Sequence, residues 1–141
     1  MMVRVKIYSD GGARGNPGPA AGAYLILNEE DEVLKSQSIF LGTRTNNQAE
    51  YEALIAALKA ASALSVGEVL CHLDSELVCR QLTGQYRVKN EDLQKLWKKT
   101  LELTRCFKKV SFFNVPRTDS YIQRADWLVN ERLDLEQNNN P

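Results

Sequence analysis

The chain has 141 residues, of which 43% are hydrophobic and 26% charged, and this composition predicts one domain with its own apolar core. Its 18 basic and 18 acidic residues give a net charge of zero, so no overall positive field attracts nucleic acid. No apolar run is long enough to cross a membrane, and the N-terminus lacks the apolar core of a signal peptide. We expect residues 1–136 to form the domain and residues 137–141 to form a flexible tail.

Apolar residues alternate with Arg, Lys and Tyr over residues 3–8, which is the period of two typical of a strand. The glycine-rich segment YSDGGARGNPG follows, and residues 22–27 and 33–41 predict two further strands joined by the polar NEEDE. Strands connected this closely pair as an antiparallel meander.

The period then changes to that of a helix. In NQAEYEALIAALKAASAL the apolar residues fall on one helical stripe, and Thr45 precedes Gln48 at the spacing of a capping box. The later elements are expected as strands at 68–73 and 109–115 and as helices at 76–82, 90–106 and 121–135. Strand and helix alternate here, which implies right-handed crossovers and parallel pairing. The sequence therefore predicts an α/β fold with a mixed five-stranded sheet and helices on its faces.

Cysteine usage is informative about metals and compartment. The three cysteines, Cys71, Cys79 and Cys106, form no CxxC pair, and the single histidine is His72. A zinc site is therefore not expected. An odd number of cysteines in a chain without a targeting signal predicts reduced thiols in the cytoplasm, with a disulfide left as the alternative for a thermophilic source.

Four acidic residues fall near the ends of the predicted elements. Asp10 ends the first strand and Asp74 follows a later one, whereas Glu50 and Asp126 lie in the first turns of helices. Sites in open α/β sheets lie at the carboxyl ends of strands, so these acids can converge. Each also has a simpler explanation, because helix dipoles favour early acids and Asp is a common turn former.

The neighbourhood of Asp10 and Asp74 favours a shared site, since each follows an apolar strand and neither lies on an obviously solvated face. Crowded carboxylates repel one another and raise their pKa values unless a cation neutralises them. Oxygen ligands without His or Cys suit Mg²⁺ or Mn²⁺ better than zinc. Carboxylate clusters that hold two such ions about 4 Å apart cleave phosphodiesters. The acids thus favour a phosphodiester-cleaving metal site.

Four segments in chain order resemble type I ribonuclease H, namely YSDGGARGNPGPAAGAY, TRTNNQAEYEALIAAL, LDSELVCRQLTGQYRVKN, and VPR followed by ADWLVNERLD. The resemblance covers the chain from about Val3 to Leu135. It implies the ribonuclease H-like fold, with strand order 3-2-1-4-5, the first three strands antiparallel, and helices on both faces. It also implies endonucleolytic hydrolysis of the RNA strand of an RNA/DNA hybrid with two Mg²⁺ or Mn²⁺ ions per site, leaving 5′-phosphate and 3′-hydroxyl ends.

The resemblance assigns roles to particular residues. The family's four acidic metal ligands, which are also its catalytic residues, correspond to Asp10, Glu50, Asp74 and Asp126. Positions that contact 2′-hydroxyls and base edges correspond to Gly11 through its backbone, Asn46, Asn47 and Gln48. Positions near the phosphates of the DNA strand correspond to Asn16 and Thr45, with Arg44 as an addition, and a loop pair near the site corresponds to Lys89 and Asn90. The capping box explains Thr45 and Gln48 equally well, and a helix cap explains Asn90.

Three positions depart from the family pattern. The residue four before Asp126, usually Asn, is Ile122, in a loop about two residues longer than usual. The loop histidine of many relatives is absent, and Arg117 is its candidate substitute because His72 is expected to be packed in a strand. Glu76 replaces a usual Gln and is expected at the surface. No metal ligand is lost, so we expect activity.

The segment TGQYRVKN is short and lacks the basic protrusion with which some family members grip the hybrid. Together with zero net charge, this predicts weaker binding with a steeper dependence on salt and metal. The basic residues between 95 and 109 are interpreted as a solvated helix face, with a phosphate-tracking stripe as the alternative.

No partner domain follows the last predicted helix, so a monomer is expected. Two alternatives for the function stay open, which are a metal nuclease acting on double-stranded RNA or cruciform DNA and a non-catalytic hybrid-binding module. Four intact acids argue against the binding module, and the amides of TNNQAE favour a protein that contacts 2′-hydroxyls.

Overall fold

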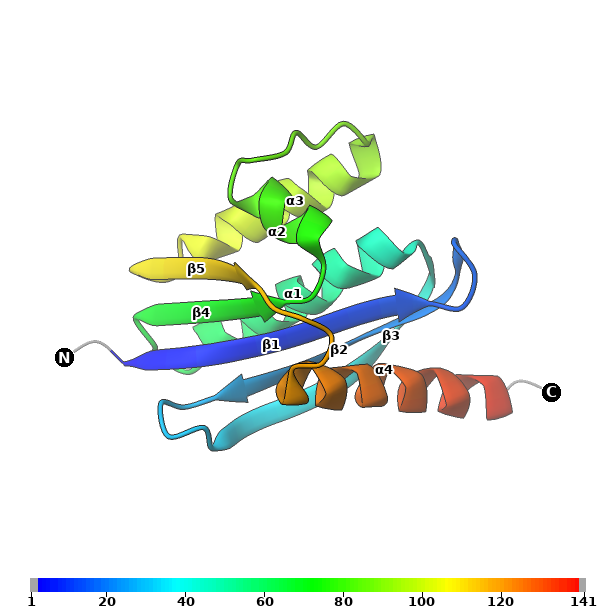
Figure 1. Cartoon of the computed structure of the whole chain (residues 1–141), viewed down its shortest axis with the longest axis horizontal. Helices are drawn as coiled ribbons and strands as arrows, with labels where there is room; N and C mark the ends of the chain where they lie inside the picture. Colours follow the sequence, from blue (N-terminus) through cyan, green and yellow to red (C-terminus); the bar gives the residue numbers. More distant parts are fainter. Residues whose placement is uncertain (1–2, 140–141) are drawn as a thin grey trace.

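The computed structural model describes residues 3–139, which form one five-stranded sheet with helices on both faces (Figure 1). The strands are β1 (Arg4–Ala13), β2 (Gly18–Leu27), β3 (Val33–Arg44), β4 (Glu68–Leu73) and β5 (Lys109–Asn114). The helices are α1 (Asn46–Ser62), α2 (Glu76–Leu82), α3 (Glu91–Thr104) and α4 (Ser120–Asn138). None of the helices in the described part of the chain has the length and apolar content needed to cross a membrane.

The strands lie in the order β3-β2-β1-β4-β5. β2 pairs antiparallel with both β1 and β3, whereas β4 pairs parallel with both β1 and β5. The predicted fold class and strand order are confirmed.

Several predicted boundaries were wrong. β2 begins at Gly18 rather than residue 22, and β3 continues to Arg44 rather than 41, because the glycine- and alanine-rich arm of β2 pairs along its length with β3. α3 ends at Thr104, two residues before the predicted end.

The C-terminal helix α4 continues to Asn138, beyond the predicted end at residue 135. Residues 137 and 138, expected in the tail, are therefore helical, and a hydrogen bond from Arg14 to Gln137 holds this last turn. Residues 140 and 141 of the predicted tail lie outside the described residues.

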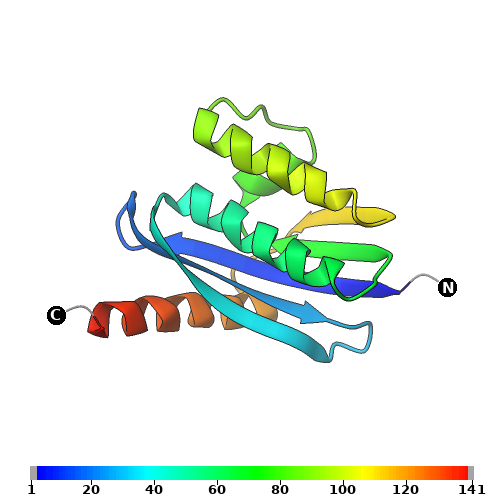
Figure 2. The ribbon, with the colours of Figure 1, turned by 180° about the vertical axis from the view of Figure 1, so that it is seen from behind.

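α1 covers one face of the sheet, and the larger apolar cluster lies beneath it (Figure 2). Tyr51, Leu54 and Leu58 of this helix are fully buried there. The predicted capping box is confirmed: the Thr45 hydroxyl accepts from the Gln48 amide at 3.2 Å, and Gln48 Oε1 accepts from the Thr45 amide at 2.8 Å. Such a cap stabilises a helix start by about 1 kcal/mol, and here it sets where the first turn of α1 begins.

α4 covers the opposite face, over β1, β2 and β3. Its buried residues recur at helical spacing and are Ile122, Ala125, Val129 and Leu133. The carboxylate of Asp119 caps its first turn by accepting from the amides of Tyr121 and Ile122 at 2.9 and 3.1 Å. The apolar stripe therefore positions α4 over the antiparallel half of the sheet, with its side facing β1.

Gly11 allows β1 and α1 to approach closely. A Cβ atom added at Gly11 would overlap the backbone of Ala49, so no side chain fits between strand and helix at this point. The close approach lets the Gly11 amide donate to Glu50 Oε1 at 3.2 Å. The fold therefore places an acid of α1 directly beside the strand that carries Asp10.

Candidate active site

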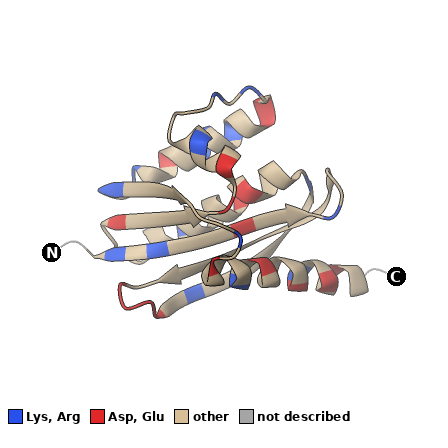
Figure 3. Cartoon of the chain, viewed as in Figure 1, with Lys and Arg blue, Asp and Glu red and all other residues tan. Residues whose placement is uncertain are grey.

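A cavity of about 630 Å³ opens where β1, α1, α4 and the loops after β4 and β5 meet. Its lining includes all four acids predicted as ligands, which are Asp10, Glu50, Asp74 and Asp126. Acidic positions of β1, α1 and α4 gather in this region (Figure 3). Four elements, β1, α1, the end of β4 and α4, thus bring their acids together near the carboxyl ends of β1 and β4.

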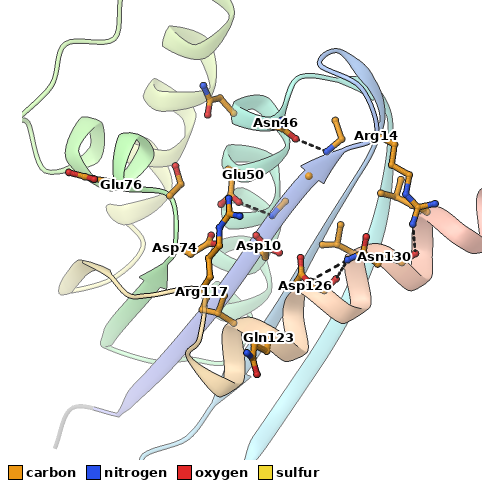
Figure 4. A pocket seen from close by; sticks show the side chains of 18 residues that line it. Asp10, Arg14, Asn46, Glu50, Asp74, Glu76, Arg117, Gln123, Asp126 and Asn130 are labelled. Atoms are coloured by element: carbon orange, nitrogen blue, oxygen red, sulfur yellow. Dashed lines mark hydrogen bonds and ion pairs between the residues drawn. The ribbon is translucent and has the colours of Figure 1, made fainter.

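Three of the acids form a tight group. Asp10, Glu50 and Asp74 each place a carboxylate oxygen within 4.8 Å of the others. Asp10 and Glu50 are only 6% and 8% exposed. Figure 4 shows these three side chains pointing toward one another from β1, α1 and the end of β4.

Burial raises the pKa values of this group. Burial raises the pKa of Asp10 to about 7, and the charges of Asp74 and Asp126 act in the same direction. Burial also raises the pKa of Glu50 well above its ordinary value, and the charge of Asp10 adds to the effect. The pKa of Asp74 is raised by burial and lowered in part by the nearby Arg117 charge. Ionising all three without a cation is therefore unfavourable.

The donor set fits a divalent metal ion. Glu50 Oε2 and Asp74 Oδ1 are buried and have no hydrogen-bond partner among residues 3–139. An unpartnered buried carboxylate oxygen is costly, and a bound cation removes that cost. Because every donor is a hard oxygen, the group suits Mg²⁺ or Mn²⁺.

Asp126 differs from the other three acids. It lines the cavity from α4 but is exposed. In the described part of the chain, it is not among the acids Asp10, Glu50 and Asp74, whose oxygens lie within 4.8 Å of one another. The side-chain nitrogen Nδ2 of Asn130 donates to the Asp126 carbonyl oxygen at 3.1 Å and lies 3.4 Å from Asp126 Oδ2. The fourth predicted ligand therefore lies at the mouth of the cavity.

Arg117 lies in the loop between β5 and α4, with Nε 3.5 Å from Asp74 Oδ2. Its side chain is 91% exposed, so the guanidinium is open to a bound substrate. Its role in place of the family's histidine stays a prediction. Glu76 also lines the cavity, but it is exposed and pairs with Arg80 at 2.8 Å, as expected of a surface residue.

His72 lies outside the cavity lining and is packed in β4, as predicted. Its ring stacks on Tyr8 with centroids 4.3 Å apart and on Phe113 with centroids 5.4 Å apart. Its Nδ1 lies 3.1 Å from the Ile7 carbonyl oxygen. These contacts give the histidine a structural explanation.

The predicted substrate contacts near the start of α1 divide into two sets. Gly11, Asn46 and Asn47 line the cavity. Asn46 Oδ1 accepts from the Ala13 amide at 2.8 Å, and the Asn46 amide donates to Asn16 Oδ1 at 2.9 Å. Asn16 and Asn46 therefore tie the β1–β2 turn to the first turn of α1.

The remaining predicted contacts lie outside the cavity lining. Thr45 and Gln48 form the capping box, and Arg44 pairs with Glu52 at 3.0 Å. Asn90 caps α3 by accepting from the Leu93 amide at 3.0 Å, and Lys89 is an exposed residue just before it. The structure thus gives most of these side chains an internal partner, and their substrate roles stay predictions.

Sequence reasoning missed Arg14, Gln123 and Asn130, which also line the cavity. Asn130 had a usable signal, because it lies one helical turn after Asp126 on the same face. Arg14 had none, because its partners Asp134 and Gln137 are about 120 residues away along the chain.

Comparison with known proteins adds independent evidence. Residues 8–132 match the protein family described as reverse transcriptase-like. The chain is 41% identical over 131 residues to the Ribonuclease HI of Halobacterium salinarum, and the match covers 93% of this chain and 65% of that protein. A crystal structure of RNase H1 from that organism superposes with a TM-score of 0.89, covering 93% of this chain and 98% of that chain.

Two further solved structures are similar. The N-terminal RNase H domain of a Mycobacterium tuberculosis protein has 37% identity and a TM-score of 0.91, covering 96% of this chain and 97% of that chain. LC11-RNase H1, solved in complex with an RNA/DNA hybrid, has 39% identity and a TM-score of 0.89, covering 94% and 99%. The chain spans 65% of the Halobacterium protein and 36% of the curated mycobacterial protein, which is named as bifunctional.

Proposed function

The chain belongs to the reverse transcriptase-like family, within type I ribonuclease H, and we propose that it hydrolyses the RNA strand of RNA/DNA hybrids. The observation that carries this proposal is the buried group of Asp10, Glu50 and Asp74 with its two unpartnered carboxylate oxygens. A protein that only binds a hybrid has no use for carboxylates that destabilise one another. The relative solved with an RNA/DNA hybrid supports the substrate class.

The proposed cofactor is a pair of Mg²⁺ or Mn²⁺ ions held by Asp10, Glu50, Asp74 and Asp126. When bound, such ions activate the attacking water and stabilise the leaving 3′ oxygen, which yields 5′-phosphate and 3′-hydroxyl ends. The Gly11 amide orients Glu50, because it donates to one oxygen at 3.2 Å and leaves Oε2 free. The low exposure of Asp10 and Glu50 limits screening by water, which strengthens the electrostatic interactions in the site.

The first proposed substrate contact is Asn46, an exposed residue of the cavity lining. Asn46 uses its side-chain oxygen for the Ala13 amide, and its NH₂ group makes no hydrogen bond within the described residues. That group can donate to a 2′-hydroxyl, the feature that distinguishes RNA from DNA. Asn47, Gln48 and the backbone of Gly11 complete this proposed set. Contacts to the DNA strand are proposed for Asn16, Arg44 and Thr45, with Lys89 and Asn90 as an outer pair.

Arg117 is proposed to act on the leaving group or the product in place of a histidine. Its exposed guanidinium near Asp74 supports this role, since a mobile cation beside the acids can neutralise a phosphate as it departs. The guanidinium cannot transfer a proton at ordinary pH, so the proposed role is electrostatic.

We also propose that the chain acts as a monomer in the cytoplasm. Cys71, Cys79 and Cys106 are free thiols in this structure, and thiols of this kind stay reduced in that compartment.

One assay tests the function. Labelled RNA/DNA hybrid, double-stranded RNA and double-stranded DNA are incubated with the protein in Mg²⁺ and in Mn²⁺, with Asp10→Asn as the matched inactive control. We expect cleavage of the RNA in the hybrid alone, 5′-phosphate ends in the product, and no cleavage by the variant. Intact hybrid in both metals would refute the enzyme and favour a binding module. Equal cleavage of double-stranded RNA would assign the protein to the other nuclease class.

A further inference from the structure

Arg14 connects the turn between β1 and β2 to the C-terminal half of α4. Its Nη2 lies 2.7 Å from Asp134 Oδ1, and its Nη1 donates to Gln137 Oε1 at 2.7 Å. The Nη2 group also lies 3.4 Å from the carbonyl oxygen of Asn130 (Figure 4). One guanidinium therefore has three partners on successive turns of a single helix.

Asn130 continues this connection to the active site. Its side chain donates to the Asp126 carbonyl oxygen at 3.1 Å and lies 3.4 Å from the Asp126 carboxylate. The polar contacts thus run from the β1–β2 turn through Arg14 and Asn130 to the one acid that lies outside the buried group. The turn begins after Ala13 at the end of β1, and both Arg14 and Asp126 line the cavity, so both ends of the connection lie there.

The apolar stripe of α4 cannot by itself hold Asp126 in place. Hydrophobic packing keeps the helix on the sheet and opposes large rotations, but it is non-directional and constrains a rotation of a few degrees less than hydrogen bonds do. An α-helix with its side chains has a radius of about 5–6 Å, and a rotation of 10° therefore moves a side-chain tip by about 1 Å. Catalytic groups must be held within about 0.5 Å of their working positions. Directional contacts are needed for the remaining precision.

We propose that Arg14 is a positioning residue that fixes the rotation of α4 and so holds the Asp126 carboxylate at the metal site. Asp134 and Gln137 anchor its guanidinium, and Asn130 transmits the position to Asp126. This inference rests on the proposed function and deepens it by assigning a role to a residue outside the ligand set. The last turn of α4, which carries Gln137, thereby becomes part of the support of the active site.

Arg132 supplies a matched control. It also ties α4 to the sheet, donating from Nε to Ser38 Oγ at 3.2 Å and from Nη2 to the Ser38 carbonyl oxygen at 3.3 Å. Its partner strand β3 carries none of the four acids. Removing Arg132 therefore removes a polar anchor of α4 whose partner, Ser38, contacts neither Asn130 nor Asp126.

The test compares Arg14→Ala, Arg14→Lys, Asn130→Ala and Arg132→Ala with the unchanged protein. Mg²⁺ binding is measured by calorimetry without substrate, and kcat, KM and the Mg²⁺ concentration for half-maximal rate are measured on the hybrid. We expect Arg14→Ala and Asn130→Ala to lower kcat on the order of ten-fold with KM within two-fold, and to weaken Mg²⁺ binding several-fold. Arg14→Lys should recover part of the loss. Arg132→Ala should change each quantity less than two-fold.

A second comparison isolates the route through Asp126. In the Asp126→Asn background, adding Arg14→Ala should weaken Mg²⁺ binding no further, because both changes remove the same ligand from its position. Additive losses would overturn the inference. So would a rise in KM alone, which would make Arg14 a substrate contact, or equal losses in Arg132→Ala, which would reflect helix stability. If the unchanged protein cleaves no hybrid, the proposed function fails, and the calorimetric comparison still decides the inference.

Discussion

The site is built from two regions that hold their acids by different means. Asp10 and Glu50 are buried, 6% and 8% exposed, between β1 and α1, and tight packing at Gly11 fixes their relation. Asp126 is exposed on α4 and is held by hydrogen bonds along one helix face. Burial makes the first region rigid and electrostatically costly, which a cation relieves. Exposure leaves the second region without close packing around its acid, so its position depends on more distant anchors.

The largest expected effect comes from removing an acid of the buried region. Asp74→Asn should lower kcat on the hybrid at least a hundred-fold in Mg²⁺, because the variant loses a ligand whose Oδ1 has no other partner in the described chain. Single-turnover cleavage at saturating metal measures the loss. Glu76→Gln is the matched control, since Glu76 pairs with Arg80 at the surface, and its rate should stay within two-fold. Comparable rates for both variants would remove Asp74 from the ligand set.

The packing of the buried region is tested by adding one methyl group. Gly11→Ala forces a Cβ atom into the backbone of Ala49, so we expect a loss of more than about 2 kcal/mol and a melting temperature lower by about 5–10 °C. Gly12→Ala is the control, because its Cβ would meet only Val129 Cγ1 at 3.9 Å. Thermal unfolding of the two variants side by side measures the difference. Equal melting temperatures would show that β1 and α1 are not in tight contact here.

The electrostatic cost of the buried region predicts a pH dependence of stability. Burial raises the pKa of Asp10 from its ordinary 3.8 to about 7, so between these values the folded chain binds more protons than the unfolded chain. The free energy of unfolding that comes from protonated Asp10 is therefore complete below about pH 4. It is lost as the pH rises toward 7.

Asp10→Asn removes this cost and serves as the comparison. In EDTA, the variant should melt above the unchanged protein by an amount that grows with pH, reaching on the order of 5 °C at pH 8. Saturating Mg²⁺ should shrink or reverse the difference, because only the unchanged protein keeps its full ligand set. Calorimetric melting at several pH values measures it. A difference independent of pH would contradict the raised pKa.

The smallest expected effect concerns Arg117, which belongs to neither region. Arg117→Ala should slow turnover several-fold without changing Mg²⁺ affinity. Its exposed guanidinium contacts just one of the four acids, Asp74, at the long distance of 3.5 Å. Steady-state kinetics together with calorimetry measure both quantities. Arg117→Lys should retain part of the rate if the role is electrostatic. An unchanged rate in Arg117→Ala would remove this residue from the mechanism.

Local patterns predicted the local parts of the molecule. Thr45 and Gln48 lie three residues apart, so the sequence shows the capping box directly, and the structure confirms it. The rule for strand ends predicted that Asp10 and Asp74 share one site, and they do. The predicted end of the first strand at Asp10 was wrong, because β1 continues to Ala13 by pairing with β2. The early start of β2 was missed because glycine and alanine carry little strand signal, and pairing with β3 decides their conformation.

Periodicity and caps in the sequence predicted the fold class, because they are properties of neighbouring residues. The resemblance to type I ribonuclease H implied the strand order, which the structure confirms, and the four candidate acids. Only the tertiary structure decided which acids are buried, which oxygens lack partners, and that Arg14 reaches Asp134 and Gln137 on the far end of the chain. Burial and contacts between distant residues depend on how the elements pack together. No pattern within one segment contains that information.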